Sequence, residues 1–326
     1  MLKKHPPATV PQVHVHAHKS VLGTEFLSRE KIRAYLDCAF HFKRLEQEGK
    51  PLPTSLAGKT VILLFFEAST RTRGSFEIAG KRLGGSTVVL TKQMSSTEKG
   101  ETLVDTARTI EAMRPDVLIL RHPSAGSPNH LDAILGVPIV NAGDGFHEHP
   151  TQALLDLMTI EEFKGKLEGL KVLIVGDIAH SRVARSDIYA LKTMGAEVSV
   201  CAPPTLMPPK VENLGVRVFY DLEKAVHDQD VVMMLRIQME RLTPGQLPSK
   251  GEYARFYGMN RELLSRCKKD VVIMHPGPVN RGVELAPDVA DGPQSIILNQ
   301  VANGVLMRMA VLHLLTGGQP PPGGER

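Results

Sequence analysis

The chain has 326 residues, of which 42% are hydrophobic and 23% charged, and its formal net charge at pH 7 is +4. The length predicts about two globular domains, and the small positive excess fits anionic small ligands and does not indicate nucleic acid. The three scattered cysteines argue against a disulfide framework, and no apolar run approaches the roughly 18 residues of a membrane span. The N-terminus lacks the apolar segment of a secretory signal, so we expect a cytoplasmic protein.

The first half of the chain alternates strand and helix patterns after a leader rich in proline and histidine. His14, His16 and His18 alternate there, and we favour a fortuitous His-rich tail over a metal site because no further ligand lies nearby. Short apolar runs predict strands at 61–66, 87–90, 117–120 and 137–141. Helical spacing predicts helices at 30–45, 102–113, 131–135 and 151–163, and one more that ends at Leu83 before two glycines.

The chain is organised around the junction between strand 61–66 and the helix that follows it. Five polar residues stand there, Ser69-Thr70-Arg71-Thr72-Arg73. A helix N-terminus offers unpaired backbone N–H groups and the positive end of the helix dipole, and hydroxyl and guanidinium groups add further donors. A plain capped helix with solvated arginines is the alternative, but two arginines and three hydroxyls exceed what capping needs. We therefore predict a binding site for phosphate or a similar dianion.

The same alternation restarts after a polar linker at 164–170. Strands are predicted at 172–175, 197–201, 216–219, 231–235 and 271–274, with helices after Arg182, at 222–228 and at 296–315. We expect an α/β fold of two doubly wound parallel-sheet domains, with a C-terminal helix that crosses back to the first domain. Ligands bind at the carboxyl ends of the strands in such folds, where Ser69–Arg73, Arg121 and His149 fall.

Three other motifs are too incomplete to carry a function. Gly58-Lys59-Thr60 imitates the end of a phosphate-binding loop but precedes a strand, when the lysine of that motif opens a helix. The strand at 172–175 leads to Gly176 without the further glycines of a dinucleotide site. His147-Glu148-His149 lacks the spacing of zinc proteases. We expect neither a metal nor a cofactor.

Several motifs occur together in an order that resembles the aspartate and ornithine carbamoyltransferase family over residues 20–315. They are Phe66-Glu67-Ala68-Ser69-Thr70-Arg71-Thr72-Arg73, Lys99-Gly100-Glu101-Thr102, Arg121-His122-Pro123, His149-Pro150-Thr151-Gln152, Arg236-Ile237-Gln238-Met239-Glu240-Arg241-Leu242 and Met274-His275-Pro276-Gly277-Pro278. The resemblance implies a carbamoyl-phosphate-binding domain at 1–150, completed by helix 296–316, a connecting helix at 151–163 and an aspartate-binding domain at 164–295. It also implies a homotrimer that shares its active sites between subunits, with a regulatory chain or a dihydroorotase as possible partners.

The resemblance assigns one group of residues to carbamoyl phosphate. It implies that catalysis rests on Arg71, Thr72, Arg121 and His149, the last three as donors to the carbonyl oxygen. The phosphate would be bound by Ser69, Thr70, Arg71, Thr72 and Arg121, and the carbamoyl amide by Gln152. Ser95 and Lys99 match residues that the family donates to a neighbouring subunit, although a polar surface loop is the alternative reading of this segment.

A second group is implied for L-aspartate. Arg182 resembles the binder of the α-carboxylate, Arg236 and Gln238 resemble binders of the side-chain carboxylate, and Lys99 also reaches this substrate. The backbone of Gly277 and Pro278 would face the amine, with a cis peptide before Pro278. Glu67 and Arg241 resemble a link between the closed domains, Glu67 also reaching Arg182, and Glu240 would orient Arg236; surface pairing is the alternative for these links.

The implied reaction transfers the carbamoyl group from carbamoyl phosphate to L-aspartate, an early step of pyrimidine biosynthesis. Ornithine carbamoyltransferase is the nearest alternative, but the loop at 275–278 has no cysteine and no Ser-Met-Gly occurs in the chain. A guanidinium at Arg236 would also repel the ammonium group of ornithine. A non-catalytic anion-binding paralogue is the alternative from another class, and the complete set of motifs argues against it.

Overall fold

A computed structural model describes residues 20–91, 101–238, 245–247 and 249–321. His14, His16, His18, Ser95, Lys99, Glu240 and Arg241 lie outside the described residues. In the described part of the chain, no helix is long and apolar enough to cross a membrane.

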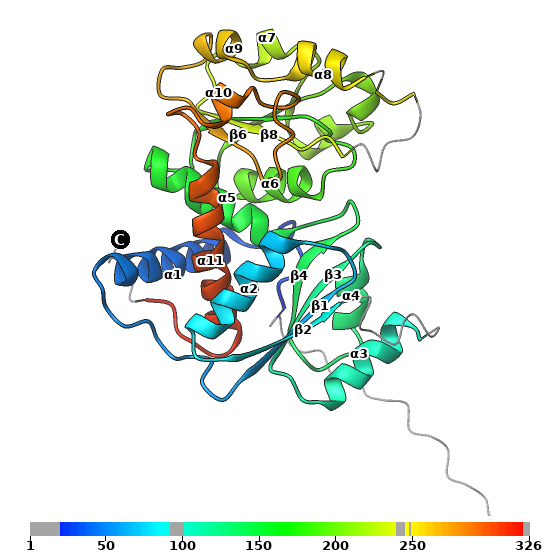
Figure 1. Ribbon diagram of the computed structural model, residues 1–326, viewed down its shortest axis with the longest axis vertical. Helices are drawn as coiled ribbons and strands as arrows, with labels where there is room; N and C mark the ends of the chain where they lie inside the picture. The colour runs from blue at the N-terminus through cyan, green and yellow to red at the C-terminus, as the bar shows by residue number, and fades with distance from the viewer. Residues whose placement is uncertain (1–19, 92–100, 239–244, 248, 322–326) are drawn as a thin grey trace, which may run out of the picture.

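The first half folds around a four-stranded parallel sheet whose strand order is β2-β1-β3-β4 (Figure 1). Its strands are β1 Thr60–Phe65, β2 Ser86–Thr91, β3 Val117–His122 and β4 Ile139–Asp144. Its helices are α1 Arg29–Gln47, α2 Thr70–Arg82, α3 Leu103–Ala112 and α4 Ser127–Asp132. Five of the six residues of β1 are buried, which explains why its sequence is continuously apolar.

The second half folds around a five-stranded parallel sheet in the order β7-β6-β5-β8-β9. Its strands are β5 Lys171–Val175, β6 Glu197–Cys201, β7 Arg217–Phe219, β8 Val231–Met234 and β9 Val272–Met274. Its helices are α6 Arg182–Thr193, α7 Leu222–Ala225, α8 Lys250–Tyr257, α9 Arg261–Ser265 and α10 Pro287–Ala290, with 3₁₀ turns at Pro204–Leu206 and Val211–Leu214.

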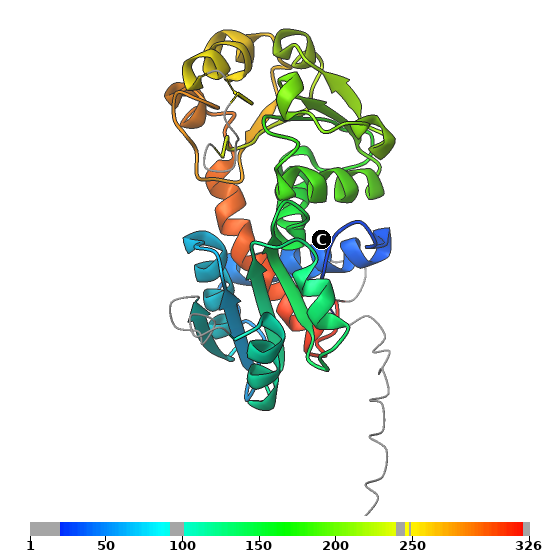
Figure 2. The same ribbon diagram turned by 90° about the vertical axis from the view of Figure 1, so that its right-hand side faces the viewer.

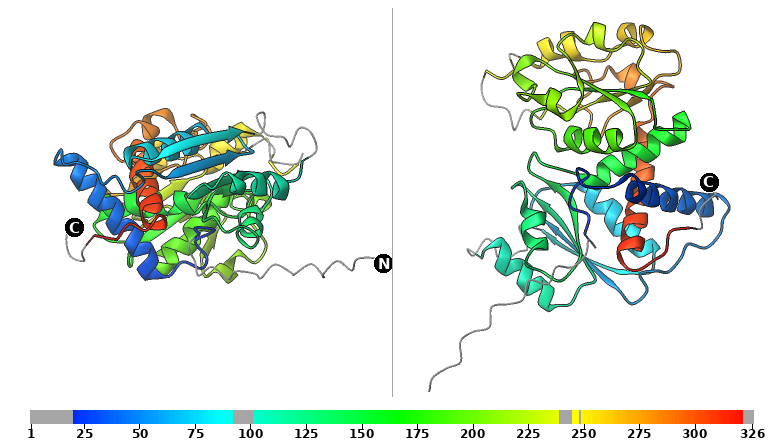
Figure 3. Two further views of the ribbon diagram at one scale, coloured as in Figure 1. Left: turned by 90° about the horizontal axis from the view of Figure 1, so that it is seen from below. Right: turned by 180° about the vertical axis from the view of Figure 1, so that it is seen from behind.

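Two long helices, α5 Pro150–Lys164 and α11 Ile297–Leu315, run between the halves (Figures 1 and 2). Residues 150–161 of α5 are all buried, as expected of a helix that is covered on every side. α11 packs against α1, α2 and α5, and the view from behind in Figure 3 shows α1 beside this junction. The predicted α/β fold, with a C-terminal helix that returns to the first half, is confirmed.

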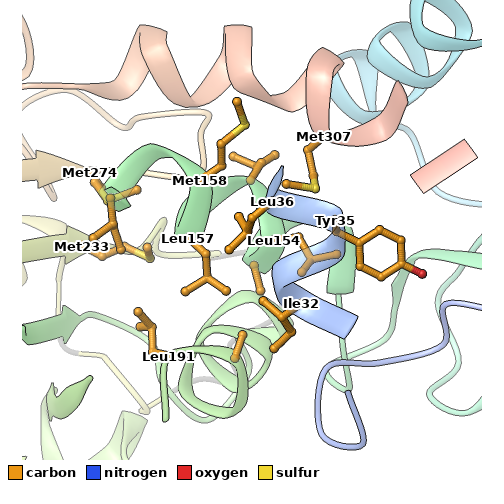
Figure 4. Close-up of a cluster of buried hydrophobic side chains, with 14 of the residues drawn as sticks. Ile32, Tyr35, Leu36, Leu154, Leu157, Met158, Leu191, Met233, Met274 and Met307 are labelled. Atoms are coloured by element: carbon orange, nitrogen blue, oxygen red, sulfur yellow. The ribbon is translucent and has the colours of Figure 1, made fainter. Parts of the chain in front are cut away.

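The hydrophobic core is continuous through this junction. Figure 4 shows side chains of α1, α5, α6 and α11 in one cluster with Met233 of β8 and Met274 of β9. The two sheets are therefore tied together by shared apolar packing as well as by two helical connections.

Some predicted boundaries are wrong for identifiable reasons. The strand predicted at 137–141 begins at Ile139, after a proline that has no N–H for the ladder, and it continues to Asp144. The helix predicted at 131–135 is α4, which starts at Ser127 behind Gly126, a residue with φ of 78°. The helix predicted at 222–228 ends at Ala225. Helices α8, α9 and α10 were not predicted, because α8 buries only Tyr253 and the other two are very short.

Candidate active site

A cavity of about 580 Å³ opens between the two halves at the junction with α11. Its wall contains all twelve residues that the sequence assigns to substrate binding within the described chain: Ser69, Thr70, Arg71, Thr72, Arg121, His149, Gln152, Arg182, Arg236, Gln238, Gly277 and Pro278. These residues come from segments spread over two hundred positions of sequence, and folding brings them to one place.

Sheet topology explains this convergence. The chain runs from β1 outward to β2 and then returns to β3 on the other side of β1, so the direction of winding switches between β1 and β3. The second sheet switches in the same way between β5 and β8. Adjacent loops diverge at a switch point and leave a crevice for a ligand. Ser69 and Arg121 stand at the first switch point, and Arg182 and Arg236 stand at the second.

The start of α2 has the features of an anion site. Ser69 is the N-cap residue, and its Oγ accepts a hydrogen bond from the Thr72 backbone N–H at 3.4 Å. No acidic residue lies in the first turn, so the positive end of the helix dipole is not neutralised there. Capping and cavity lining coexist at Ser69, because its hydroxyl can still donate a hydrogen bond.

Glu67 joins two of the cavity arginines. Its Oε2 lies 2.8 Å from the Arg182 guanidinium and 3.4 Å from Arg121 Nε. Gly143, with φ of 113°, makes room for both arginines, because a Cβ there would lie 3.0 Å from each guanidinium. The predicted contact between Glu67 and Arg182 is therefore present, and it connects the end of β1 to the start of α6.

The loop after β9 brings polar backbone toward Arg71. The Gly277–Pro278 peptide is cis, as the resemblance implied. A Cβ on Gly277, whose φ is 67°, would lie 3.2 Å from the Arg71 guanidinium carbon. Burial lowers the pKa of Arg71, and the nearby charge of Arg236 lowers it further. Cations drawn from both halves of the chain thus approach one another at this cavity, which favours anionic ligands.

His149 contributes a neutral imidazole to the wall. Its backbone N–H donates to Ser186 Oγ at 2.8 Å, and the Ser186 hydroxyl donates to Glu148 Oε2 at 2.7 Å. Burial lowers the pKa of His149 well below its ordinary value, and Arg121, Arg182 and Arg308 lower it further. Its Nδ1 has no hydrogen-bond partner within the described residues. A neutral imidazole on the cavity wall suits hydrogen bonding to a ligand.

The sequence analysis missed two cavity residues on α11, Gln300 and Arg308. The Arg308 guanidinium donates to the Gly304 carbonyl at 3.0 Å and stands 5.1 Å from the centre of the Phe76 ring. Gln300 donates from Nε2 to Asp156 at 2.7 Å and accepts from the His275 backbone N–H at 2.9 Å. Both are buried polar residues of α11, but Asn303 and His313 of the same helix are buried as well, so buried polarity alone does not single them out.

Comparisons with known proteins match this architecture. Residues 19–162 match the family profile of the aspartate/ornithine carbamoyltransferase carbamoyl-P binding domain, and residues 168–315 match that of the Asp/Orn binding domain. An aspartate carbamoyltransferase catalytic subunit of Syntrophotalea carbinolica is 54% identical over 93% of this chain and 96% of its own length.

Two solved structures are similar in fold. Aspartate transcarbamoylase of Trypanosoma cruzi in complex with N-(phosphonacetyl)-L-aspartic acid has a TM-score of 0.81, 34% identity and coverage of 90% of this chain and 94% of its own. Ornithine carbamoyltransferase of Pyrococcus furiosus has a TM-score of 0.82, 33% identity and coverage of 92% and 97%. The fold is therefore common to both activities, whereas the higher identity is to a catalytic subunit of the aspartate enzyme. The chain belongs to the aspartate/ornithine carbamoyltransferase family, among its aspartate carbamoyltransferase catalytic subunits.

Proposed function

We propose that this chain transfers the carbamoyl group of carbamoyl phosphate to the α-amine of L-aspartate, giving N-carbamoyl-L-aspartate and phosphate. The observation that carries the proposal is the joining of two switch-point crevices, each lined by arginines, in one cavity. One crevice suits a phosphorylated substrate and the other a dicarboxylic amino acid. The identity to aspartate carbamoyltransferase catalytic subunits supports the same reaction.

The first crevice would bind carbamoyl phosphate. We assign the phosphate to the start of α2, with Ser69, Thr70, Arg71, Thr72 and Arg121 as its donors. Thr72, Arg121 and His149 would donate to the carbonyl oxygen, and Gln152 would accept from the carbamoyl amide. The proposed carbamoyl-phosphate domain is 1–150, completed by helix 296–316.

The second crevice would bind L-aspartate. We assign the α-carboxylate to Arg182 and the side-chain carboxylate to Arg236 and Gln238, with the Gly277–Pro278 backbone facing the amine. The proposed aspartate domain is 164–295, and 151–163 is the connecting helix. Ornithine fits this crevice poorly because its side-chain ammonium would meet the Arg236 guanidinium.

The reaction needs no nucleophilic side chain. The neutral amine of aspartate attacks the carbonyl carbon, and the tetrahedral intermediate expels phosphate, which can accept the proton that the amine loses. Negative charge develops on the carbonyl oxygen, where the Arg121 guanidinium and the neutral His149 imidazole stabilise it. Holding two anionic substrates side by side supplies much of the remaining acceleration.

We also propose that the active unit is a homotrimer in which Ser95 and Lys99 complete the site of a neighbouring subunit; a regulatory chain or a dihydroorotase would be a further partner. Mixing two inactive variants, Lys99→Ala and Arg236→Ala, tests the sharing of sites. Reassembled hybrids should regain activity, because some interfaces then carry neither substitution. Mixtures as inactive as their components would contradict it.

The reaction itself is tested by a colorimetric assay for ureido products. Purified protein is given carbamoyl phosphate with L-aspartate or with L-ornithine in parallel. Product with aspartate alone is the expected result. Product with ornithine alone would overturn the proposed substrate, and product with neither would favour a non-catalytic anion-binding protein.

A further inference from the structure

We propose that Asp156 is a positioning residue that holds the Gln152 amide with its oxygen available to the carbamoyl group, and that Asp187 carries the proton of this buried carboxyl pair. The inference rests on the proposed function, because it concerns how carbamoyl phosphate is recognised. Neither residue lines the cavity, and the mechanism above does not use them.

Asp156 is placed beneath both substrate crevices. It lies on α5, is 1% exposed, and accepts hydrogen bonds from Gln152 Nε2 at 3.1 and 3.2 Å. It also accepts from Gln300 Nε2 at 2.7 Å. Gln300 in turn holds the His275 backbone N–H at 2.9 Å, at the start of the loop that carries Gly277 and Pro278. One carboxylate thus orients a group in each crevice.

An ionised carboxylate fixes which end of an amide faces it. It can only accept hydrogen bonds, so it attracts the NH₂ end of Gln152 and leaves the carbonyl oxygen of the amide for other contacts. A carbamoyl group differs from an acetyl group by carrying NH₂ in place of CH₃. An amide oxygen on the cavity wall can accept a hydrogen bond from that NH₂ group. An amide NH₂ in the same place could not, because both groups would then be donors. Asp156 would therefore contribute to choosing a carbamoyl group over an acetyl group.

Asp187 supports this arrangement from α6. Both carboxyl groups are buried, and each is close enough to feel the charge of the other, so keeping both ionised is unfavourable and one of them is expected to keep a proton. Burial raises the pKa of both, that of Asp156 to about 7, and the Asp156 charge raises that of Asp187 well above its ordinary value. The charge of Arg308 on α11 and the two glutamine amides favour ionised Asp156, whereas Asp187 Oδ2 has no hydrogen-bond partner within the described chain. The proton therefore belongs to Asp187.

Binding of two phosphates tests this assignment without requiring turnover. Titration calorimetry would measure the Kd of carbamoyl phosphate and of acetyl phosphate for the wild type, Asp156→Asn and Asp187→Asn. The matched control is Glu161→Gln, which alters another buried carboxylate of α5 whose partner is Arg33 at 2.8 Å. Melting temperatures would show that each variant is folded.

Asp156→Asn should weaken carbamoyl phosphate binding by roughly tenfold to a hundredfold, because one amide donor loses its acceptor. The Kd of acetyl phosphate should change less than about threefold, since acetyl phosphate has no NH₂ group to bond to the Gln152 oxygen. Asp187→Asn replaces a protonated carboxyl by an amide, which can still donate toward Asp156. This variant should therefore keep the orientation of Gln152 and the wild-type preference for carbamoyl phosphate over acetyl phosphate. Equal weakening of both ligands by Asp156→Asn, or an Asp187→Asn variant as impaired as Asp156→Asn, would overturn the inference.

Infrared spectroscopy covers the case in which Asp156→Asn does not fold. Wild-type protein near neutral pH should show the carbonyl band of a buried protonated carboxyl group, and Asp187→Asn should lack it. Absence of the band from the wild type would equally overturn the assignment. A wild type that binds carbamoyl phosphate but forms no ureido product would refute the proposed function and leave both of these measurements interpretable.

Discussion

The proposed role of His149 depends on the protonation state of its imidazole ring. Burial lowers its pKa well below 6.5, and the surrounding guanidinium groups lower it further, so the ring is neutral at physiological pH. A neutral imidazole can donate one hydrogen bond to the carbonyl oxygen, and a ring with so low a pKa does not change its charge near neutral pH.

We predict that His149→Ala lowers kcat by about a hundredfold to a thousandfold, the usual cost of removing one donor to an oxyanion. His147→Ala is the control, because His147 bonds to Asp144 at 3.0 Å and does not line the cavity. Steady-state kinetics and thermal melts on both variants check this. A His149→Ala enzyme within a few-fold of wild-type turnover would remove His149 from the mechanism.

Gly143 is the residue that lets two arginines meet. A side chain at φ of 113° is strained, and its Cβ would lie 3.0 Å from both Arg121 and Arg182. We predict that Gly143→Ala lowers the free energy of unfolding by about 1–3 kcal/mol and raises the KM for aspartate. Gly126→Ala has the same sign of φ, 78°, but open space around its Cβ, so it should lose stability while keeping KM. Equal KM changes in the two variants would contradict the crowding argument.

At the scale of the elements, sequence patterns predicted the strands and their polar carboxyl ends. An apolar run precedes or ends at each of five site residues: Ser69, Arg121, His149, Arg182 and Arg236. Parallel strands place their carboxyl ends at the same edge of a sheet, which brings these residues together. Contributions from α11 were not predictable in this way. Gln300 and Arg308 reach the cavity only because a helix from the end of the chain packs on α2 and α5, and such long-range contacts leave no local pattern.

Gly277 shows a second limit of sequence reasoning. The resemblance gave a role only to its backbone, which would face the amine of the substrate. In the structure this glycine has φ of 67°, and a Cβ there would lie only 3.2 Å from the Arg71 guanidinium carbon. The identity of residue 277 is therefore coupled to the position of Arg71.

Glu67 links three elements, the end of β1, the end of β3 and the start of α6. We predict that Glu67→Gln lowers kcat/KM for aspartate by about tenfold, because Arg182 loses a charged partner that holds it in place. If the two residues act as one unit, the double variant Glu67→Gln/Arg182→Gln should have nearly the same kcat/KM as the single variant Arg182→Gln. Steady-state kinetics on the three proteins measure that coupling, and strictly additive effects would contradict it.

At the scale of the whole molecule, buried titratable groups sit where the two halves meet and act on stability in opposite directions. Burial lowers the pKa of His149 and lowers that of His275 to about 3, so the unfolded chain binds more protons at these histidines below about pH 6.5. Their contribution to stability therefore rises with pH in that range. Asp156 and Asp187 have raised pKa values and contribute with the opposite sign.

The contribution of the Asp156–Asp187 pair can be tested by comparing the wild type with Asp187→Asn, which removes one member of the pair. Above the unfolded pKa of 3.8 and below the raised folded pKa, the folded protein holds a proton that the unfolded chain has released. The free energy of unfolding of the wild type then falls as pH rises, by up to about 1.4 kcal/mol per pH unit from this group. The variant has no such proton, whereas both proteins contain His149 and His275, whose effects cancel in the difference. Denaturant titrations between about pH 5 and pH 8 should therefore show Asp187→Asn gaining stability relative to the wild type as pH rises. A difference that is constant with pH would mean that Asp187 is already ionised in the folded protein.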